Sequence, residues 1–409
     1  MGKDLNGKEL GRGITQRKDG RYMGRIHIRG SKKEVTLYDR NLKMLKNKVN
    51  TYRALAGTSQ WDISMTVTEW FEQWMEIYNV PVLKATTIRN YWDGFKRIQP
   101  LIGDRRVIDI KSNNILSALY VLKENGYAPA TIKQTFTILK VMFSMAYRVR
   151  AVLYNPCEGM RAPTERTHQE IIEREESQNL EKDVQRFLDA CRHTRYYELF
   201  YILSRTGLRI GEACALEWKD VDLERKCIYI DKTVNKVKKY YDSKGRKMES
   251  SKMVAQITSP KKQASYRIVP ISDETVNAFA AWKTKQLADK QRWGRKWGIK
   301  NELLKDFPDL IFTTSPGKTY LPGYATQECK RISDCINRRE KQMALSENRE
   351  SEFIHIHPHL FRYFYVTKCV EKGMNPVMIG KITGHAEIRM TQHYTRLSDE
   401  FILRQHEVH

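Results

Sequence analysis

Residues 154 to 176 read YNPCEGMRAPTERTHQEIIEREE, and this stretch separates parts of the chain that cannot share one hydrophobic core. It holds two prolines, a glycine and alternating charges, a composition typical of a linker. The chain has 409 residues, more than one core usually holds, and its 41% of hydrophobic residues suffices for well-packed cores on both sides. We therefore expect a multidomain protein with boundaries at about 1–60, 61–153 and 177–409.

Before this linker, residues 65–150 carry apolar side chains at helical spacing. We expect four helices: over about 67–78, from a cap at Thr86 or Thr87, over about 112–123, and from Pro129 onward. Three of them show apolar stripes that predict a helical core rather than a base-stacking surface. The stripes are Val67, Trp70, Phe71, Trp74, Ile77 and Tyr78; Ile88, Tyr91, Trp92, Phe95 and Ile98; and Ile132, Phe136, Leu139, Phe143 and Ala146. Lys133 and Lys140 lie off the stripe, where they would contact DNA phosphates or form a solvated face.

The first sixty residues form a basic unit, with fifteen Lys or Arg against five Asp or Glu. Short strands are expected over 13–16, 21–29 and 34–38, followed by a helix over 41–55 that covers the apolar face of the sheet. In the middle strand Tyr22, Gly24, Ile26 and Ile28 alternate with a row of mostly basic side chains. This basic face predicts contact with DNA, against the alternative of a solvated surface. The predicted contacts are Arg21, Arg25, His27, Arg29, Lys32 and Lys33.

After the linker the chain mixes helices with a strand cluster over 226–271. Within this cluster, residues 236–256 are strongly basic and read as an inserted hairpin that turns at 243–245. Two interpretations stay open, a clamp on DNA and a mobile surface loop. The fold class that results is mainly α with small β-sheets, namely a three-stranded sheet plus helix, a helical domain and an α+β domain.

The net charge of +24 predicts a polyanionic partner, because the chain would otherwise repel itself. Nucleic acid is the first candidate and an anionic membrane the second. No apolar run of about 18 residues is present, so no span of a bilayer is expected. The seven cysteines show no C-x-x-C spacing, which favours a reducing cytoplasm over a disulfide framework or a cysteine zinc site.

Four separated segments carry polar side chains suited to one chemistry. They are TGLRIGEACALEW (206–218), TSPKKQASYRIVPIS (258–272), IHPHLFRYFYVT (356–367) and ITGHAEIRMTQHYTRL (382–397). The candidate catalytic set drawn from them is Arg209, Lys261, His359, Arg362, His385 and Tyr394. Cations stabilise charge on a phosphoryl group, and a phenol surrounded by positive charge ionises more readily and can act as a nucleophile. The set therefore suits attack on a phosphodiester. A zinc site at His385 and His393 is disfavoured by their spacing and by the missing partner ligands.

The chain resembles the tyrosine recombinase family. The R-I-G-E box, the P-K…R-x-x-P hairpin, the H-x-x-R helix and the G-H…H-Y-T segment stand in the family's order and at its spacing. The helical unit resembles the family's core-binding domain. The basic N-terminal unit is similar to the arm-binding domain of integrases from conjugative transposons. The resemblance implies a catalytic domain over 177–409 that ends in a tail helix, which packs on a neighbouring subunit or on its own domain.

The resemblance also implies roles for the six residues. Arg209 and Arg362 would bind the scissile phosphate, and Lys261, with Lys262 as its rival, would protonate the leaving 5′ oxygen. His359 would assist proton transfer from the phenol and His385 would contact the phosphate. Tyr394 would form a 3′-phosphotyrosyl bond that conserves bond energy, so no metal, ATP or other cofactor is expected.

The partners implied are double-stranded DNA at core and arm sites and a homo-oligomer on DNA, with a tetramer in the synaptic complex. An excisionase or DNA-bending protein fits as an accessory factor. The expected location of the chain is the bacterial cytoplasm, at the nucleoid. A type IB topoisomerase and a DNA-binding regulator with an inactive site are the alternatives to a transposon integrase. The separate basic N-terminal module argues against the topoisomerase, and the intact set of six argues against the regulator.

Overall fold

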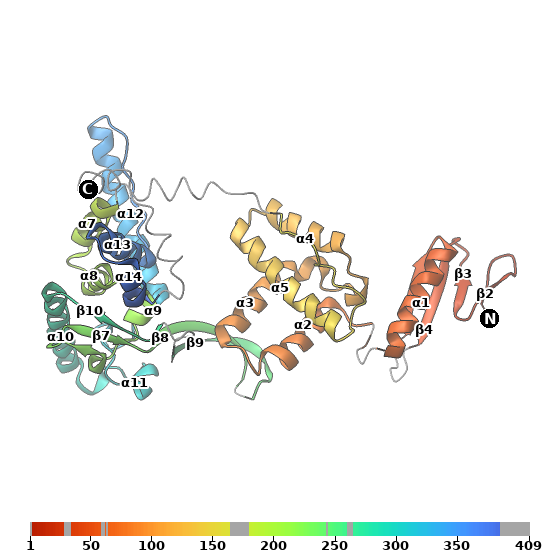
Figure 1. Ribbon diagram of the computed structural model, residues 1–409, viewed down its shortest axis with the longest axis horizontal. Helices are drawn as coiled ribbons and strands as arrows, with labels where there is room; N and C mark the ends of the chain where they lie inside the picture. Colours follow the sequence, from red (N-terminus) through yellow and green to blue (C-terminus); the bar gives the residue numbers. More distant parts are fainter. Residues whose placement is uncertain are drawn as a thin grey trace. The chain divides into compact units, whose positions relative to one another are not determined.

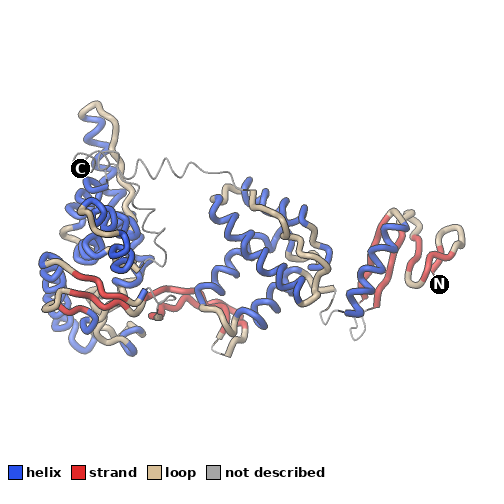
Figure 2. Tube along the Cα trace, viewed as in Figure 1, coloured by secondary structure: helices blue, strands red, loops and turns tan. Residues whose placement is uncertain are grey.

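The computed structural model describes residues 2–27, 34–58, 62, 64–163, 180–242, 244–259 and 265–384 (Figure 1). The chain forms two compact units. The first holds Met1–Arg166 together with Lys238–Lys252, and the second holds Thr167–Val237 together with Met253–His409. Helices dominate the described residues and the sheets are small, as predicted (Figure 2).

The basic N-terminal part of the first unit is a three-stranded antiparallel sheet covered by one helix (Figure 1). The sheet order is β3 (Ile14–Gln16), β4 (Tyr22–His27), β5 (Glu34–Asp39), and α1 (Leu42–Thr58) lies on its apolar face. Gly24 of β4 faces the helix so closely that an added Cβ would lie 2.5 Å from a Val49 methyl group. The predicted strands, alternation and covering helix are confirmed within the described residues.

A small hairpin precedes this sheet and was not predicted from the sequence. It pairs β1 (Gly2–Lys3) with β2 (Glu9–Gly11). Strands of two and three residues are too short to show the alternation on which strand prediction depends.

The helical part of the first unit contains α2 (Val67–Trp74), α3 (Ala85–Ile102), α4 (Ser112–Glu124) and α5 (Pro129–Arg148). Its core contains the predicted stripes with one exception, Ile77, whose side chain is 53% exposed. A π-helical turn, η1 (Met75–Asn79), follows α2 and shifts the phase of the stripe, which turns Ile77 outward. The predicted cap at Thr86 or Thr87 is also wrong, because α3 begins at Ala85 after Lys84.

The inserted hairpin consists of β8 (Thr233–Tyr241) and β9 (Lys247–Thr258), and it turns where predicted, with Gly245 at φ +75°. Its tip is part of the first unit and packs into the helical core through Tyr240 and Tyr241. The Tyr240 ring stacks on Trp92 at 5.2 Å between centroids and 18° between planes. The described part of the tip is therefore packed into a core, an outcome that neither a DNA clamp nor a mobile loop anticipated.

The second unit is built from helices around a three-stranded antiparallel sheet in the order β10 (Arg267–Pro270), β7 (Cys227–Ile230), β6 (Val221–Asp222). The P-K…R-x-x-P segment (258–272) was predicted to be a hairpin between two strands. Strands β9 and β10 do flank it, but the hairpin is wrong, because β10 pairs with β7 while β9 pairs with β8. Strand partners are set by distant residues, which a local pattern does not encode.

The helices of the second unit supply most of its core. They are α7 (Leu180–Cys191), α8 (Tyr197–Thr206), α9 (Ile210–Ala213), α10 (Asp273–Trp293), α11 (Leu303–Asp306), α12 (Pro322–Ser346), α13 (Pro358–Glu371) and α14 (Pro376–Thr383). Helix α8 packs against α13 and α10, and α14 packs against β10 (Figure 1). All seven cysteines are free thiols and six are buried. None of the helices among the described residues is long and apolar enough to cross a membrane.

Candidate active site

The turn between α8 and α9 positions Arg209. Helix α8 ends at Gly207, which adopts the left-handed conformation with φ +63°. A Cβ added to Gly207 would lie 2.5 Å from the Tyr365 ring of α13, so only glycine fits this turn without displacement. Arg209 then becomes the residue that precedes α9. The R-I-G-E box thus begins at the turn between α8 and α9, next to Tyr365 of α13.

Glu212, the glutamate of the R-I-G-E box, fixes the side chain of Arg209. One carboxylate oxygen accepts a hydrogen bond from Arg209 Nη1 at 2.8 Å, and the other accepts from the Arg209 backbone N–H at 3.0 Å. The side chain of Glu212 is only 5% exposed, whereas that of Arg209 is 36% exposed. Arg209 is therefore anchored at its base and still accessible from solvent.

Arg267 of β10 binds the same carboxylate from the other side. Its Nη2 donates to Glu212 Oε2 at 2.7 Å and its Nη1 to Oε1 at 3.1 Å, a bidentate fork between two buried side chains. Burial by itself would raise the pKa of Glu212, but the hydrogen bonds and charges of Arg267 and Arg209 outweigh it, so the pKa lies below its ordinary value. Glu212 is thus a carboxylate shared by two guanidinium groups.

Arg267 was not among the predicted site residues, although it is the arginine of the P-K…R-x-x-P motif. The motif shows where Arg267 stands in the sequence but not which residue it binds. Its partner Glu212 is 55 residues away in sequence, so the pairing follows from the fold.

Arg362 lies on the buried face of α13, with its side chain among the largest that are fully buried. Its Nη1 donates to the Gly207 carbonyl at 2.8 Å and its Nη2 to the Thr383 carbonyl at 2.6 Å. Arg362 thus joins the α8–α9 turn to the end of α14. Arg362 is 1% exposed, so it lies inside the protein, whereas the Arg209 side chain reaches the surface.

Three arginines converge on the C-terminal end of α14. The last carbonyls of a helix have no partner inside the helix and carry its negative dipole end, so cations are favoured there. Each arginine comes from a different element and donates to one of three successive carbonyls. Arg267 Nε binds the Ile382 oxygen at 2.6 Å, Arg362 Nη2 the Thr383 oxygen at 2.6 Å, and Arg209 Nη2 the Gly384 oxygen at 3.2 Å.

His359 stands one helical turn before Arg362 on α13, as expected from the H-x-x-R spacing. A third or more of the residue is exposed. The protein atoms packed around the imidazole, and then the positive charges of Arg362 and Arg209, lower the pKa of His359 below its ordinary value. The neutral imidazole, which can accept a proton, is therefore favoured.

Several predicted residues lie outside the described residues, namely Lys261 and its rival Lys262, His385, His393, Tyr394, Arg29, Lys32 and Lys33. Of the six candidate catalytic residues, the structure brings together Arg209, His359 and Arg362. The roles of all six stay predictions.

The remaining predicted DNA contacts are exposed side chains of the first unit. Arg21 pairs with Asp19 at 2.7 Å, and His27 lies 3.6 Å from Glu34. On α5, the Lys140 ammonium lies 5.8 Å from the centre of the Phe136 ring. Arg25 and Lys133 are also exposed. Their contact with DNA stays a prediction.

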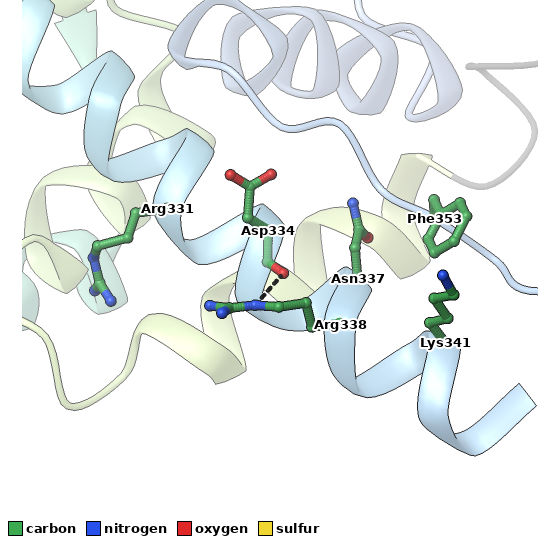
Figure 3. Close-up of a pocket in the computed structure, with 6 residues that line it drawn as sticks. All are labelled: Arg331, Asp334, Asn337, Arg338, Lys341 and Phe353. Carbon is green, nitrogen blue, oxygen red and sulfur yellow. Dashed lines mark hydrogen bonds between the residues drawn. The ribbon is translucent and has the colours of Figure 1, made fainter.

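A separate hollow of about 550 Å³ lies along α12, and none of the three described candidate catalytic residues lines it (Figure 3). Its lining is Arg331, Asp334, Asn337, Arg338, Lys341 and Phe353. Arg338 Nε donates to the Asp334 carbonyl of its own helix at 3.3 Å. The candidate active site is therefore the arginine cluster, where chemically suited groups converge. No group of three or more metal-binding side chains occurs among the described residues.

Comparison with known proteins agrees with these motifs. Residues 179–400 match the phage integrase family, and residues 66–117 match the N-terminal SAM-like domain of phage integrases. The chain is 25% identical to a XerC-like tyrosine recombinase of Caldanaerobacter subterraneus, over 80% of this chain and 78% of that protein. It is 26% identical to the transposase from transposon Tn916 of Enterococcus faecalis, over 72% of this chain and 64% of that protein.

Solved structures show the same fold at low sequence identity. The integrase of transposon Tn1549, in complex with a circular intermediate DNA, matches with a TM-score of 0.63 and 20% identity, over 84% of this chain and 99% of that one. A lambda integrase dimer bound to a core site matches with a TM-score of 0.53 and 16% identity, over 82% and 98%. Because the family match at 179–400 covers more than half of the residues and contains all four motifs, the chain belongs to the phage integrase family and is a tyrosine recombinase.

Proposed function

We propose that this tyrosine recombinase is the integrase of a conjugative transposon, a DNA strand transferase that inserts and excises the element. The observation that carries this proposal is the convergence of Arg209, Arg267 and Arg362 at the end of α14, immediately before the G-H…H-Y-T segment. The names of two relatives, the Tn916 transposase and the Tn1549 integrase, support the kind of element.

The proposed reaction exchanges one phosphodiester for another. The oxygen of Tyr394 attacks the scissile phosphorus, a bond forms between them, and the bond from phosphorus to the 5′ oxygen breaks. His359 takes the phenolic proton, and Lys261, or its neighbour Lys262, gives a proton to the departing 5′ oxygen. A 5′ hydroxyl from the partner duplex then attacks the phosphotyrosine and frees the tyrosine. The number of phosphoester bonds is unchanged, so the reaction needs neither ATP nor a redox cofactor.

Charge in the site supports this assignment. Glu212 supplies one negative charge to the two guanidinium groups of Arg209 and Arg267, and this group of three therefore keeps a net positive charge. A surplus of positive charge in a partly buried site favours an anion whose charge grows in the transition state. We assign the non-bridging phosphate oxygens to Arg209 and Arg362, and a hydrogen bond to the phosphate to His385. Guanidinium groups in this role replace a metal ion.

DNA and further copies of the chain are the proposed partners. Lambda integrase has been solved as a dimer and as a tetramer on DNA, which supports a homotetramer in the synaptic complex. We assign core sites to the helical domain (61–153) and the catalytic domain (177–409), and arm sites to the N-terminal domain (1–60). The net charge of +24 supports DNA as the partner. An excisionase or DNA-bending protein would assist excision, in the bacterial cytoplasm at the nucleoid.

The test is to trap the covalent complex. The full chain is incubated with duplexes of the element's ends that carry a nick near the scissile phosphate, so that the released fragment diffuses away. We expect a covalent adduct in which mass spectrometry locates the phosphorus on Tyr394. Tyr394→Phe should form no adduct, while Tyr127→Phe, a matched change at an exposed tyrosine of the helical unit, should react normally.

Two outcomes would contradict the proposal. If no adduct forms with any end sequence while DNA is still bound, the chain is a DNA-binding regulator. If adducts form and supercoiled DNA is relaxed, but strands are never exchanged between two duplexes, the chain is a topoisomerase.

A further inference from the structure

We propose that Arg267 is a positioning residue for strand transfer, which keeps the charge of Arg209 available to the phosphate and fixes the end of α14. The inference rests on the proposed function. Arg267 is not among the residues to which the motifs assign a chemical step. Its place in the cluster follows from its contacts alone.

Burial of the Arg267 guanidinium costs desolvation free energy, so its position calls for an explanation other than stability. Its side chain is 4% exposed, and it donates to four acceptors, both Glu212 oxygens and the carbonyls of Ser265 and Ile382. A buried ion pair adds little net stability compared with apolar side chains of the same volume, because both charges must leave water. Stability alone therefore does not account for an arginine at this position of β10.

The first function of Arg267 is electrostatic. Without it, the single charge of Glu212 would face only the guanidinium of Arg209, 2.8 Å away, and would cancel its charge. With it, Glu212 is neutralised by a guanidinium that is itself buried, and the exposed Arg209 keeps a net positive field toward solvent. With Arg267 present, Glu212 therefore orients Arg209 without cancelling the positive charge that would attract the phosphate.

The second function is geometric. Glu212 Oε1 accepts from Arg209 and Arg267 together, at 2.8 and 3.1 Å, so the position of one guanidinium depends on the other. Through Nε, Arg267 also holds the Ile382 carbonyl, next to the carbonyls held by Arg362 and Arg209. Removing this one side chain therefore loosens both the arginine that faces solvent and the helix end beside it.

Arg267→Lys tests this role, because lysine keeps the charge but cannot form the bidentate fork. The full chain is compared with wild type on two nicked duplexes, one with an ordinary scissile phosphate and one with a methylphosphonate there. The methylphosphonate carries no negative charge and depends less on a well-placed guanidinium. The readout is the single-turnover rate at which the strand with the free 5′ hydroxyl is released at saturating DNA. Arg225→Lys, at an exposed arginine of the same unit, is the control.

We expect Arg267→Lys to cleave the phosphate duplex about 100-fold more slowly, with DNA affinity within about threefold of wild type. The ratio of methylphosphonate rate to phosphate rate should rise at least about tenfold over the wild-type ratio. Arg225→Lys should match wild type in both. An unchanged ratio, a normal rate on phosphate, or loss of the folded state by circular dichroism would each overturn the assignment. If wild type itself releases no strand, the proposed function fails instead, so the two failures are distinguishable.

Discussion

The hairpin tip should depend on the ring of Tyr240 for its attachment to the helical core. Tyr240 is 8% exposed and stacks on Trp92, and the Lys96 ammonium lies 4.8 Å from the centre of its ring. Removing a buried aromatic side chain costs about 3–5 kcal/mol, of which the stacked pair accounts for about 0.5–1.5 kcal/mol. Tyr240→Ala should therefore raise the population of the detached tip by a factor of about 100 or more, since 1.4 kcal/mol is tenfold.

Tyr240→Phe is the matched control. It keeps the ring and removes a hydroxyl whose hydrogen bonds to Asp93 and Lys96 are long, at 3.3 and 3.4 Å. A well-formed hydrogen bond to a charged group contributes about 1.5–3 kcal/mol, but these two are long and only partly buried, so each should contribute less. The phenylalanine variant should therefore stay close to wild type.

Hydrogen exchange of the backbone amides of 238–252, measured by mass spectrometry in the full chain, reports this local opening directly. In Tyr240→Ala these amides should exchange about 100-fold faster, while those of α10 in the other unit should be unchanged. Equal exchange in Tyr240→Ala and wild type would show that the tip is held by other contacts. A phenylalanine variant as open as the alanine variant would show that the hydroxyl, and not the stacked ring, holds it.

Three further predictions concern the second unit. Because the pKa of His359 is lowered, its imidazole stays neutral below pH 6.5. With His359 in its proposed role as the base, the cleavage rate should therefore fall only in more acidic buffer, and His359→Gln should lose this dependence on acid. Gly207→Ala should destabilise the unit by about 2–5 kcal/mol, measured by thermal unfolding, because its Cβ would clash with the Tyr365 ring and its φ is +63°. Arg349 and the backbone N–H of residue 352 lower the pKa of Glu340 to about 2, from 4.5. This stabilisation is full above pH 4.5 and lost as the pH falls toward 2, so Glu340→Gln should flatten that part of the stability profile.

Local patterns in the sequence predicted the elements whose partners are near in the chain. The alternation around Gly24 and Ile26 gave both the middle strand and the face that α1 covers. The stripe from Ile132 to Ala146 gave a buried helix face. In each case the period of the apolar residues matched the geometry of one strand or helix, so the pattern alone predicted the element and its buried face.

Features set by distant residues were not predictable in this way. The partner of β10 is β7, 37 to 43 residues earlier in the ladder, and the tip of the hairpin joins a core more than a hundred residues upstream. Ile77 was misassigned because one π-helical turn changes the period within a single helix. For the site, the motifs placed Arg209, His359 and Arg362, but the pairing of Glu212 with Arg267 appears only once β10 lies beside α9.

The end of α14 explains why the site needs more arginines than a phosphate can contact. The free carbonyls of a helix C-terminus repel an anion, so a phosphate beside Gly384 would be unfavourable unless those carbonyls were neutralised. Arg362 and Arg267, both nearly inaccessible to solvent, bind the carbonyls of Thr383 and Ile382 and perform this neutralisation. Within the described parts of the chain, Arg209 commits two of its guanidinium N–H donors, to Glu212 and to Gly384, out of the five that a guanidinium carries. Under the proposed function, Arg267 and Arg362 therefore neutralise the helix end, Arg362 is also assigned a phosphate oxygen, and the exposed Arg209 keeps donors for the phosphate.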